Sequence, residues 1–187
     1  MNLYSHFSVS GFSNTFVVTS EGEALVIDPG TFDRQLLLLI EDNHLRIRSV
    51  LLTHWHRSHT SGIRTMGRIY DFTVHSYYPG TAECPCSEVR EGDRIPCGAV
   101  EAVCLETPGH SGDSVSYRVE DCLFTGDTLM AGEIGSAASP ADRRALIDGV
   151  WGKLMVWGEQ TLIFPGHGPP TRVGIERRFN PSLVCED

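Results

Sequence analysis

Short apolar runs alternate with polar turns along the chain, and this alternation predicts most of its secondary structure. Strands are predicted where apolar residues are continuous or alternate over a few positions, because that pattern suits the buried face of a sheet. The predicted strands are residues 16–19, 24–27, 49–52, 72–75, 100–105, 114–119, 122–124 and 161–164. The first two are joined by the turn Ser20–Glu23, which predicts a hairpin.

Two segments with apolar residues at helical spacing are predicted to be helices. Residues 32–43 are rich in leucine and follow Thr31, a possible N-cap. Residues 140–155 follow Ser139, which can cap, and begin with Pro140, which suits the first helical position. A weaker helix is expected after His59, to about residue 66. Interleaved strands and helices predict an α/β fold in which helices cover sheets.

Composition narrows the class of protein. A chain of 187 residues with 41% apolar content is long enough for one core, so residues 1–187 are expected to form a single domain. The net charge of −9 argues against nucleic acid or an anionic membrane as a partner. No segment reads as a secretory signal or a membrane span, so we expect a cytoplasmic protein. The oligomeric state stays open.

Six cysteines in such a chain do not indicate a disulfide scaffold. Cys104 and Cys122 fall in apolar runs and are expected in the core. Cys84, Cys86 and Cys97 form a looser group that could be a second metal site or a redox pair. Their spacing is not that of a CxxC pair and no fourth ligand is obvious, so their role is left open.

Potential metal ligands follow four of the predicted strands. Glycine or a sharp turn accompanies each, and loops at strand ends are where a rigid scaffold positions functional side chains. Clustered neutral imidazoles with a carboxylate suit zinc or iron. These candidate ligands are His54, His56, His59, His110, Asp127 and His167. A fifth strand end carries Asp28 without a histidine.

Three motifs resemble those of one known family. They are Thr107-Pro-Gly-His110-Ser-Gly, Phe124-Thr-Gly-Asp127-Thr-Leu and Pro165-Gly-His-Gly-Pro169. With the run of histidines at 54–59, they are similar to the metallo-beta-lactamase superfold family, and most of all to its small glyoxalase-II-like (hydroxyacylglutathione hydrolase-like) subgroup. The resemblance implies an α/β, metallo-beta-lactamase-like four-layer αβ/βα sandwich with a metal site along one edge.

The resemblance also assigns the ligands. His54, His56 and His110 would hold the first metal, Asp127 would bridge, and His59 with His167 would hold a second. Ser58 stands where the family has an Asp ligand, and a neutral hydroxyl is a poorer ligand for a divalent cation. We therefore expect one zinc ion and a weakened second site, with iron as an alternative metal. Ser58 itself is expected to serve as a helix N-cap, as Asp can.

A second departure lies at residues 132–138. Ser136 stands where relatives commonly have Arg, and Ala138 stands where they have Asp. Losing both suggests altered substrate recognition or weak activity. Only 20 residues follow His167, too few for the helical domain that binds glutathione in full-length glyoxalase II. The resemblance therefore does not imply glutathione thioesters as substrates.

The function expected from this resemblance is that of a metal-dependent hydrolase acting on a small-molecule substrate. A small thioester or related acyl ester would be attacked by a metal-bound hydroxide. Asp127 would act as ligand and orient the water, and Asp28 would support a ligand-bearing loop from behind. Two alternatives remain. His54, His110 and Asp127 form the ligand set of a mononuclear Fe(II) persulfide dioxygenase-like enzyme, and the departures at Ser58 and Ser136 would also suit a degenerate metal-binding protein.

Overall fold

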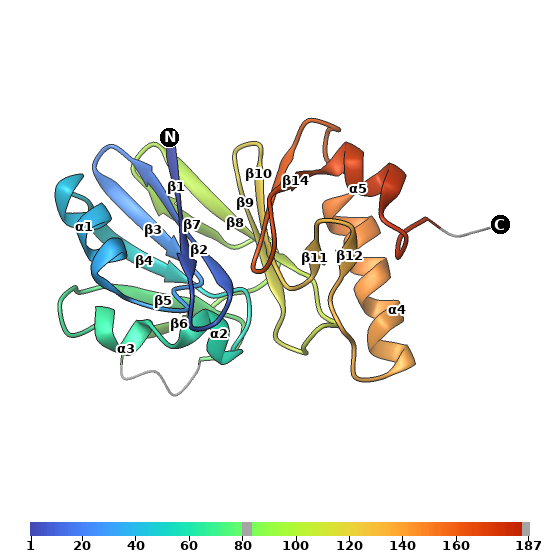
Figure 1. The fold of residues 1–187 in the computed structure, drawn as a ribbon, viewed down its shortest axis with the longest axis horizontal. Coiled ribbons are helices and arrows are strands. Elements are labelled where there is room, and N and C mark those ends of the chain that lie inside the picture. Colours follow the sequence, from blue (N-terminus) through green and yellow to red (C-terminus); the bar gives the residue numbers. More distant parts are fainter. Residues whose placement is uncertain (80–83, 185–187) are drawn as a thin grey trace.

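The computed structural model describes residues 1–79 and 84–184. In this part of the chain two six-stranded sheets pack face to face, with helices on both outer sides (Figure 1). The first sheet has the order β1-β2-β3-β4-β5-β6, with strands β1 (Asn2–Ser8), β2 (Ser13–Ser20), β3 (Glu23–Ile27), β4 (Arg46–Leu51), β5 (Thr73–Ser76) and β6 (Cys86–Glu88). The second has the order β14-β13-β10-β9-β8-β7, with strands β7 (Arg94–Cys97), β8 (Val100–Glu106), β9 (Val115–Val119), β10 (Cys122–Gly126), β13 (Leu162–Pro165) and β14 (Thr171–Arg172).

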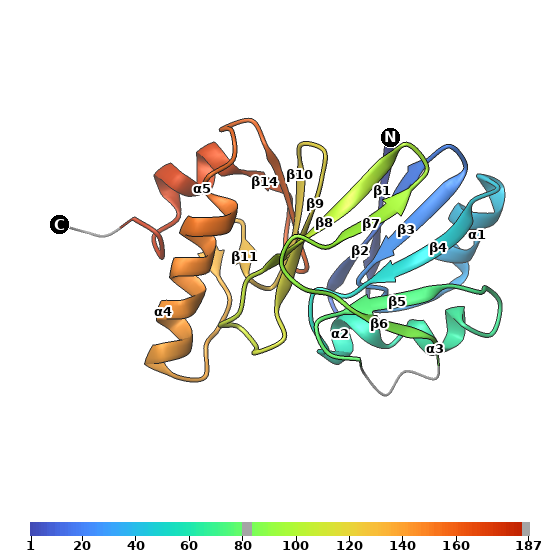
Figure 2. The same ribbon diagram turned by 180° about the vertical axis from the view of Figure 1, so that it is seen from behind.

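The remaining elements are a small hairpin and six helical segments. The hairpin pairs two short strands, β11 (Leu129–Met130) and β12 (Glu133–Ile134). The helical segments are α1 (Arg34–Asp42), α2 (Arg57–Thr60), α3 (Ile63–Met66), α4 (Pro140–Gly149), the π-helical η1 (Val150–Leu154) and α5 (Val173–Phe179). Seen from behind in Figure 2, α1 and α3 lie on the side of the first sheet, and α4 and α5 on the side of the second. Within the described residues, no helix combines the length and apolar character needed to cross a membrane.

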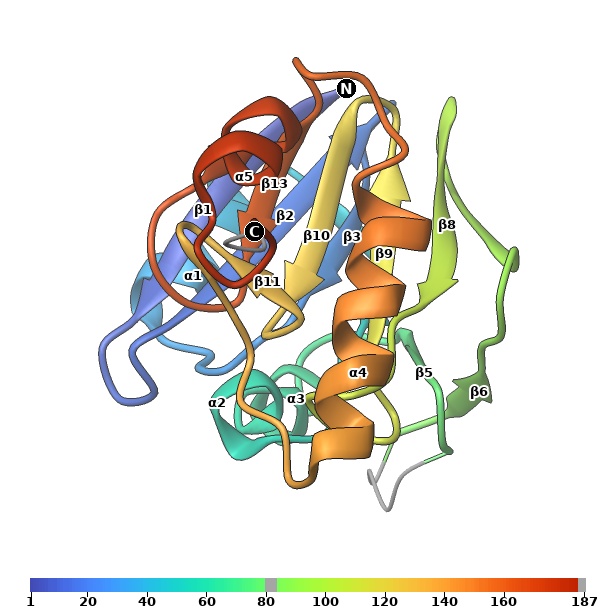
Figure 3. The same ribbon diagram turned by 90° about the vertical axis from the view of Figure 1, so that its right-hand side faces the viewer.

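Three apolar layers hold these four layers of structure together. Phe16, Leu25 and Phe124 belong to the core between the sheets, which also contains the fully buried ring of Tyr117. A second core lies between the first sheet and its helices and includes Leu36. The third joins the second sheet to α4, η1 and α5 (Figure 3). The four-layer αβ/βα sandwich expected from the sequence is therefore confirmed.

Every strand predicted from the apolar pattern is present, and the predicted hairpin is β2 and β3. Strand β1 was missed because its residues alternate without a strong apolar face, its side chains being mostly exposed or half-buried. The short strands β6, β7, β11, β12 and β14 and helix α5 were also missed. Short elements such as these depend on tertiary contacts more than on local pattern.

Two predicted caps differ in outcome. Ser139 caps α4 as expected, its hydroxyl accepting a hydrogen bond from the Asp142 amide. Thr31 does not cap α1, because Asp33 does so by accepting from the amides of residues 35 and 36. The Thr31 hydroxyl is engaged instead with the hydroxyls of Ser8 and Ser10 on the β1–β2 turn.

Candidate metal centre

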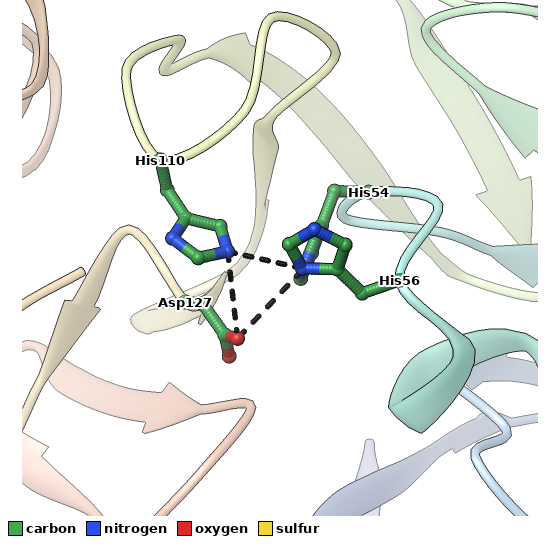
Figure 4. Close-up of side chains that lie close together, drawn as sticks. All are labelled: His54, His56, His110 and Asp127. Carbon is green, nitrogen blue, oxygen red and sulfur yellow. Dashed lines mark hydrogen bonds and ion pairs between the residues drawn. The ribbon is translucent and has the colours of Figure 1, made fainter. Parts of the chain in front are cut away.

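Four of the predicted ligands converge where loops from both sheets meet (Figure 4). His54 and His56 follow β4, His110 lies in the loop between β8 and β9, and Asp127 directly follows β10. The His56 Nδ1 atom is 2.8 Å from His54 Nε2 and 3.1 Å from His110 Nε2. The Asp127 Oδ2 atom is 3.7 Å from each of those two Nε2 atoms.

These separations suit a shared cation. A tetrahedral zinc ion with Zn–N distances near 2.0–2.1 Å has ligand atoms about 3.3 Å apart along each edge. The four measured separations, from 2.8 to 3.7 Å, lie on either side of that value. Three imidazole nitrogens and one carboxylate oxygen are also a donor set that zinc or iron accepts.

A second group of three ligands shares Asp127 with the first. The Asp127 Oδ1 atom faces His59 Nε2 at 3.4 Å, and its Oδ2 atom lies 3.5 Å from His167 Nε2. The His59 Nε2 and Asp127 Oδ1 atoms are both buried without a hydrogen-bond partner. Unsatisfied buried polar atoms are costly, so two that face each other indicate a place for a cation.

Glycine is required beside this second group. A Cβ atom on Gly166 would lie 2.5 Å from His59 Cε1 and 2.7 Å from Asp127 Oδ1. Any side chain there would therefore collide with both ligands. The Gly166 amide also donates to the Gly126 carbonyl at 2.8 Å, which fixes the β13 loop against the β10 loop.

Asp28 supports ligands of both groups. Its carboxylate accepts hydrogen bonds from the Thr53 amide at 2.8 Å and the Thr53 hydroxyl at 2.7 Å. The same hydroxyl lies 3.0 Å from His54 Nδ1, and Asp28 Oδ2 lies 3.1 Å from His59 Nδ1. Protons on both Nδ1 atoms leave the two Nε2 atoms directed at the ligand groups.

Backbone carbonyls orient two further histidines in the same way. His110 Nδ1 donates to the Ser136 carbonyl at 3.0 Å, and His167 Nδ1 donates to the Phe12 carbonyl at 2.8 Å. Phe12, which supplies one of these carbonyls, has a φ of +50°, a value that is unusual for a bulky residue. His56 differs from the other four histidines because its Nδ1 atom faces the ligand group.

Burial and charge set the protonation of the ligands. Burial lowers the pKa of His54 to about 3, so this imidazole is neutral at pH 7, as a metal ligand must be. Burial also opposes the charge of His59, but Asp28 and Asp127 outweigh it and raise its pKa to about 10. Burial alone would raise the pKa of Asp127, yet His59 holds it down at about 2. Without a metal, the His59 imidazolium therefore balances the two carboxylates.

Comparison with known proteins shows the family to which this chain belongs. The family model described as the metallo-beta-lactamase superfamily matches residues 9–89 and 85–175. The chain belongs to this superfamily. The hydroxyacylglutathione hydrolase of Hahella chejuensis is 33% identical over 157 residues, which cover 81% of this chain and 59% of that protein.

Two solved structures share the superfamily fold with this chain. ETHE1 from Myxococcus xanthus has a TM-score of 0.88 at 28% identity, covering 97% of this chain and 84% of that one. TTHA1623 in a di-iron-bound form has a TM-score of 0.82 at 26% identity, covering 95% of this chain and 98% of that one. The second comparison shows that a protein similar to this chain over nearly its full length has been seen with two iron ions.

In this member of the superfamily, Ser58 brings no imidazole, carboxylate or thiolate to either ligand group. It lies in the first turn of α2, whose N-cap is His56 without a side-chain cap, so the expectation that Ser58 caps the helix is wrong. The Ser58 carbonyl accepts from Ser13, and a Cβ on Gly11 would lie 3.4 Å from Ser58 Cβ. The serine therefore packs beneath the β1–β2 turn.

The three cysteines left open by the sequence lie away from both groups. Cys97 is fully buried between the sheets, and burial raises the pKa of its thiol. Cys84 and Cys86 pack against the core under the first sheet, on its helix side. Within the described residues no cysteine joins either ligand group, so the structure gives these thiols no part in the site.

Sequence reasoning missed several residues that shape the site. Thr53 relays the contact from Asp28 to His54, and Asp113 accepts a hydrogen bond from the Trp55 amide at 2.9 Å, joining the loops of two ligands. The carbonyls of Phe12 and Ser136 carry no signal in the sequence, because any residue supplies one. For Thr53 and Asp113 the sequence offers one signal, which is that each lies next to a ligand motif.

Proposed function

We propose that this protein is a metal-dependent hydrolase that cleaves a small thioester or related acyl ester. The observation that carries the proposal is the convergence of six ligand-type side chains into two groups that share Asp127. Membership of the superfamily and similarity to a hydroxyacylglutathione hydrolase support the same class of reaction. Zinc is proposed for the first group, and iron is the alternative.

The residues present fit such an ion. A divalent cation held there supplies a nucleophile at neutral pH by lowering the pKa of water, and it polarises the carbonyl under attack. The role proposed for His54, His56 and His110 is to bind it as neutral donors. Asp127 would belong to both groups, and His56 is exposed, so the first group is open to solvent on that side.

Asp28 is proposed to position ligands without touching the substrate. It is 2% exposed and bonds Thr53 and His59, so it holds the loop after β4 in the conformation that brings three histidines together. Partners of this kind fix ring orientation and raise ligand basicity.

The test is thiol release from a panel of small acyl thioesters, with a hydroxyacylglutathione included, by the zinc-loaded and iron-loaded protein. Metal-dependent hydrolysis that is lost in His54→Ala supports the proposal. His44→Asn is the matched control, because His44 is exposed, lies at the opposite end of β4 from His54 and has a φ of +50° that Asn tolerates. Metal binding without turnover of any thioester or ester would instead favour the degenerate binding protein.

A mononuclear Fe(II) persulfide dioxygenase-like activity is the second candidate. The observation behind it is that His54, His110 and Asp127 converge, because two imidazoles and one carboxylate are the ligand set of non-haem Fe(II) oxygenases, with His56 beside them in the same group. The similarity to ETHE1 in fold and in sequence, at 28% identity, supports this candidate. Oxygen uptake by the iron-loaded protein with glutathione persulfide, in the absence of thioester hydrolysis, would select this candidate.

A further inference from the structure

The outer face of the second sheet is only partly covered by helices. In Figure 3, α4 passes in front of part of β9, whereas no helix lies in front of β8. Where the chain leaves η1, Trp157 packs over the open part of the sheet and borders a hollow of about 370 Å³. The rest of its lining comes from strands β7, β8 and β9, from Glu91 and Gly92 before β7, and from Glu120 after β9.

Strand register places Arg118 in the middle of this hollow. Arg118 on β9 pairs with Val103 on β8, and Val103 pairs with Arg94 on β7. Paired residues of antiparallel strands point to the same face of a sheet. Tyr117 and Val119, on either side of Arg118, are buried between the sheets, so Arg118 points outward.

The Arg118 guanidinium is stacked but not hydrogen-bonded. Its central carbon lies 3.9 Å from the centroid of the Trp157 ring. Its Nε atom is buried and has no hydrogen-bond partner. Among the described residues it also forms no ion pair, although stacking fixes the plane in which its donors point.

Acidic residues in the lining do not satisfy this guanidinium. Glu101 is paired with Arg94. Glu91 is held by the Lys153 ammonium at 2.8 Å and by the Glu106 amide at 2.7 Å. Glu120 is exposed at the end of β9 and makes no ion pair within the described residues.

We infer that this hollow binds a small monocarboxylate with an apolar body. The ligand carboxylate would accept hydrogen bonds from Arg118, whose planar fork matches two carboxylate oxygens. Its body would lie on Val103, Leu105 and the Trp157 ring, which form the apolar part of the lining. A dianion such as phosphate fits less well, because three glutamates surround the same space.

This site is separate from the candidate metal centre. The metal ligands lie in loops at the strand ends, whereas Arg118 lies within β9 on the face turned toward Trp157. Its occupancy therefore does not depend on which reaction the metal centre performs.

The three tryptophans of the chain give a direct test. Benzoate is titrated into the metal-loaded protein while the indole N–H signals are followed by NMR, and Trp157→Phe assigns the signal of Trp157. Trp55 lies between two metal ligands, so its signal reports benzoate at the metal centre instead. Benzyl alcohol, which keeps the ring without the charge, and inorganic phosphate serve as comparison probes.

We expect benzoate to shift the Trp157 signal saturably, and benzyl alcohol and phosphate to bind at least about tenfold more weakly. Arg118→Gln should weaken benzoate binding by about tenfold or more, since hydrogen bonds to a charged partner are lost. Arg118→Lys keeps the charge but not the planar fork, so its affinity for benzoate should lie between those of the wild type and Arg118→Gln. Arg172→Gln, an arginine on the same sheet outside the hollow, should leave binding unchanged.

Three results would overturn the inference. One is a benzoate response confined to Trp55, another is equal binding by wild type and Arg118→Gln with the fold intact by NMR, and the third is tighter binding of phosphate than of benzoate.

Discussion

The two ligand groups of the candidate metal centre differ in the number and type of donor atoms that they offer. The first has three imidazole nitrogens and a carboxylate oxygen at separations from 2.8 to 3.7 Å. The second has His59, His167 and the carboxylate that it shares with the first group, and two of its buried atoms, His59 Nε2 and Asp127 Oδ1, have no hydrogen-bond partner. We therefore expect the second group to bind its ion more weakly than the first, because Ser58 on α2 supplies no carboxylate.

The largest effect is expected from the residue that both groups share. Asp127→Ala removes the carboxylate that both groups share, so both should lose metal and activity should fall by more than the 10–100-fold typical of losing an outer partner. Metal content per chain and thioester turnover measure this. The matched control is Asp121→Ala, an exposed aspartate on the turn before the same strand. Retention of two metals by Asp127→Ala would refute the assignment of a shared ligand.

A smaller effect is expected from the residue that supports both groups from behind. Asp28→Asn keeps the size of the side chain but loses the charge and one acceptor that hold Thr53 and His59. Metal affinity should fall by about 10–100-fold with the fold retained. Competition with a chelator gives the affinity, and circular dichroism gives the fold. Unchanged metal occupancy would remove Asp28 from the site.

The smallest and most discriminating change acts on the weaker group alone. Ser58→Asp should raise the affinity for a second ion by about tenfold or more, equivalent to about 1.4 kcal/mol, while the first ion is unaffected. Metal analysis of the variant beside the wild type measures the change. Two tightly bound ions in the wild type would show that three ligands suffice for the second group. Ser61→Asp, on the same turn, is the control.

Apolar runs ending in glycine-containing turns predicted the main strands and the loops that carry His54, His110 and Asp127. The four-layer arrangement came from the resemblance to the superfamily, and the assignment of these residues as metal ligands stays a prediction. Contacts made by the backbone were not predictable. The carbonyl of Phe12, which bonds His167, lies in the turn that joins β2 to β1, a strand without a clear apolar face.

Two predicted helix N-caps were wrong for a similar reason. Thr31 and Ser58 are both of residue types that favour N-caps. The Thr31 hydroxyl instead hydrogen-bonds Ser10 on the β1–β2 turn, and Ser58 packs under that turn. Tertiary contacts from a single hairpin turn therefore overrode local preference at two positions. Likewise, the hollow at Arg118 depends on cross-strand register and on where Trp157 lands, and neither is visible in local sequence.

The origin of the six candidate ligands has a consequence for how the protein matures. His54, His56 and His59 follow a strand of the first sheet, and His110, Asp127 and His167 lie in loops of the second. Neither sheet can assemble a ligand group alone, so tight metal capture has to wait until the two halves have docked. Metal uptake would then be a late event in folding. The rate at which refolding chains bind metal would therefore report the rate at which the two sheets dock.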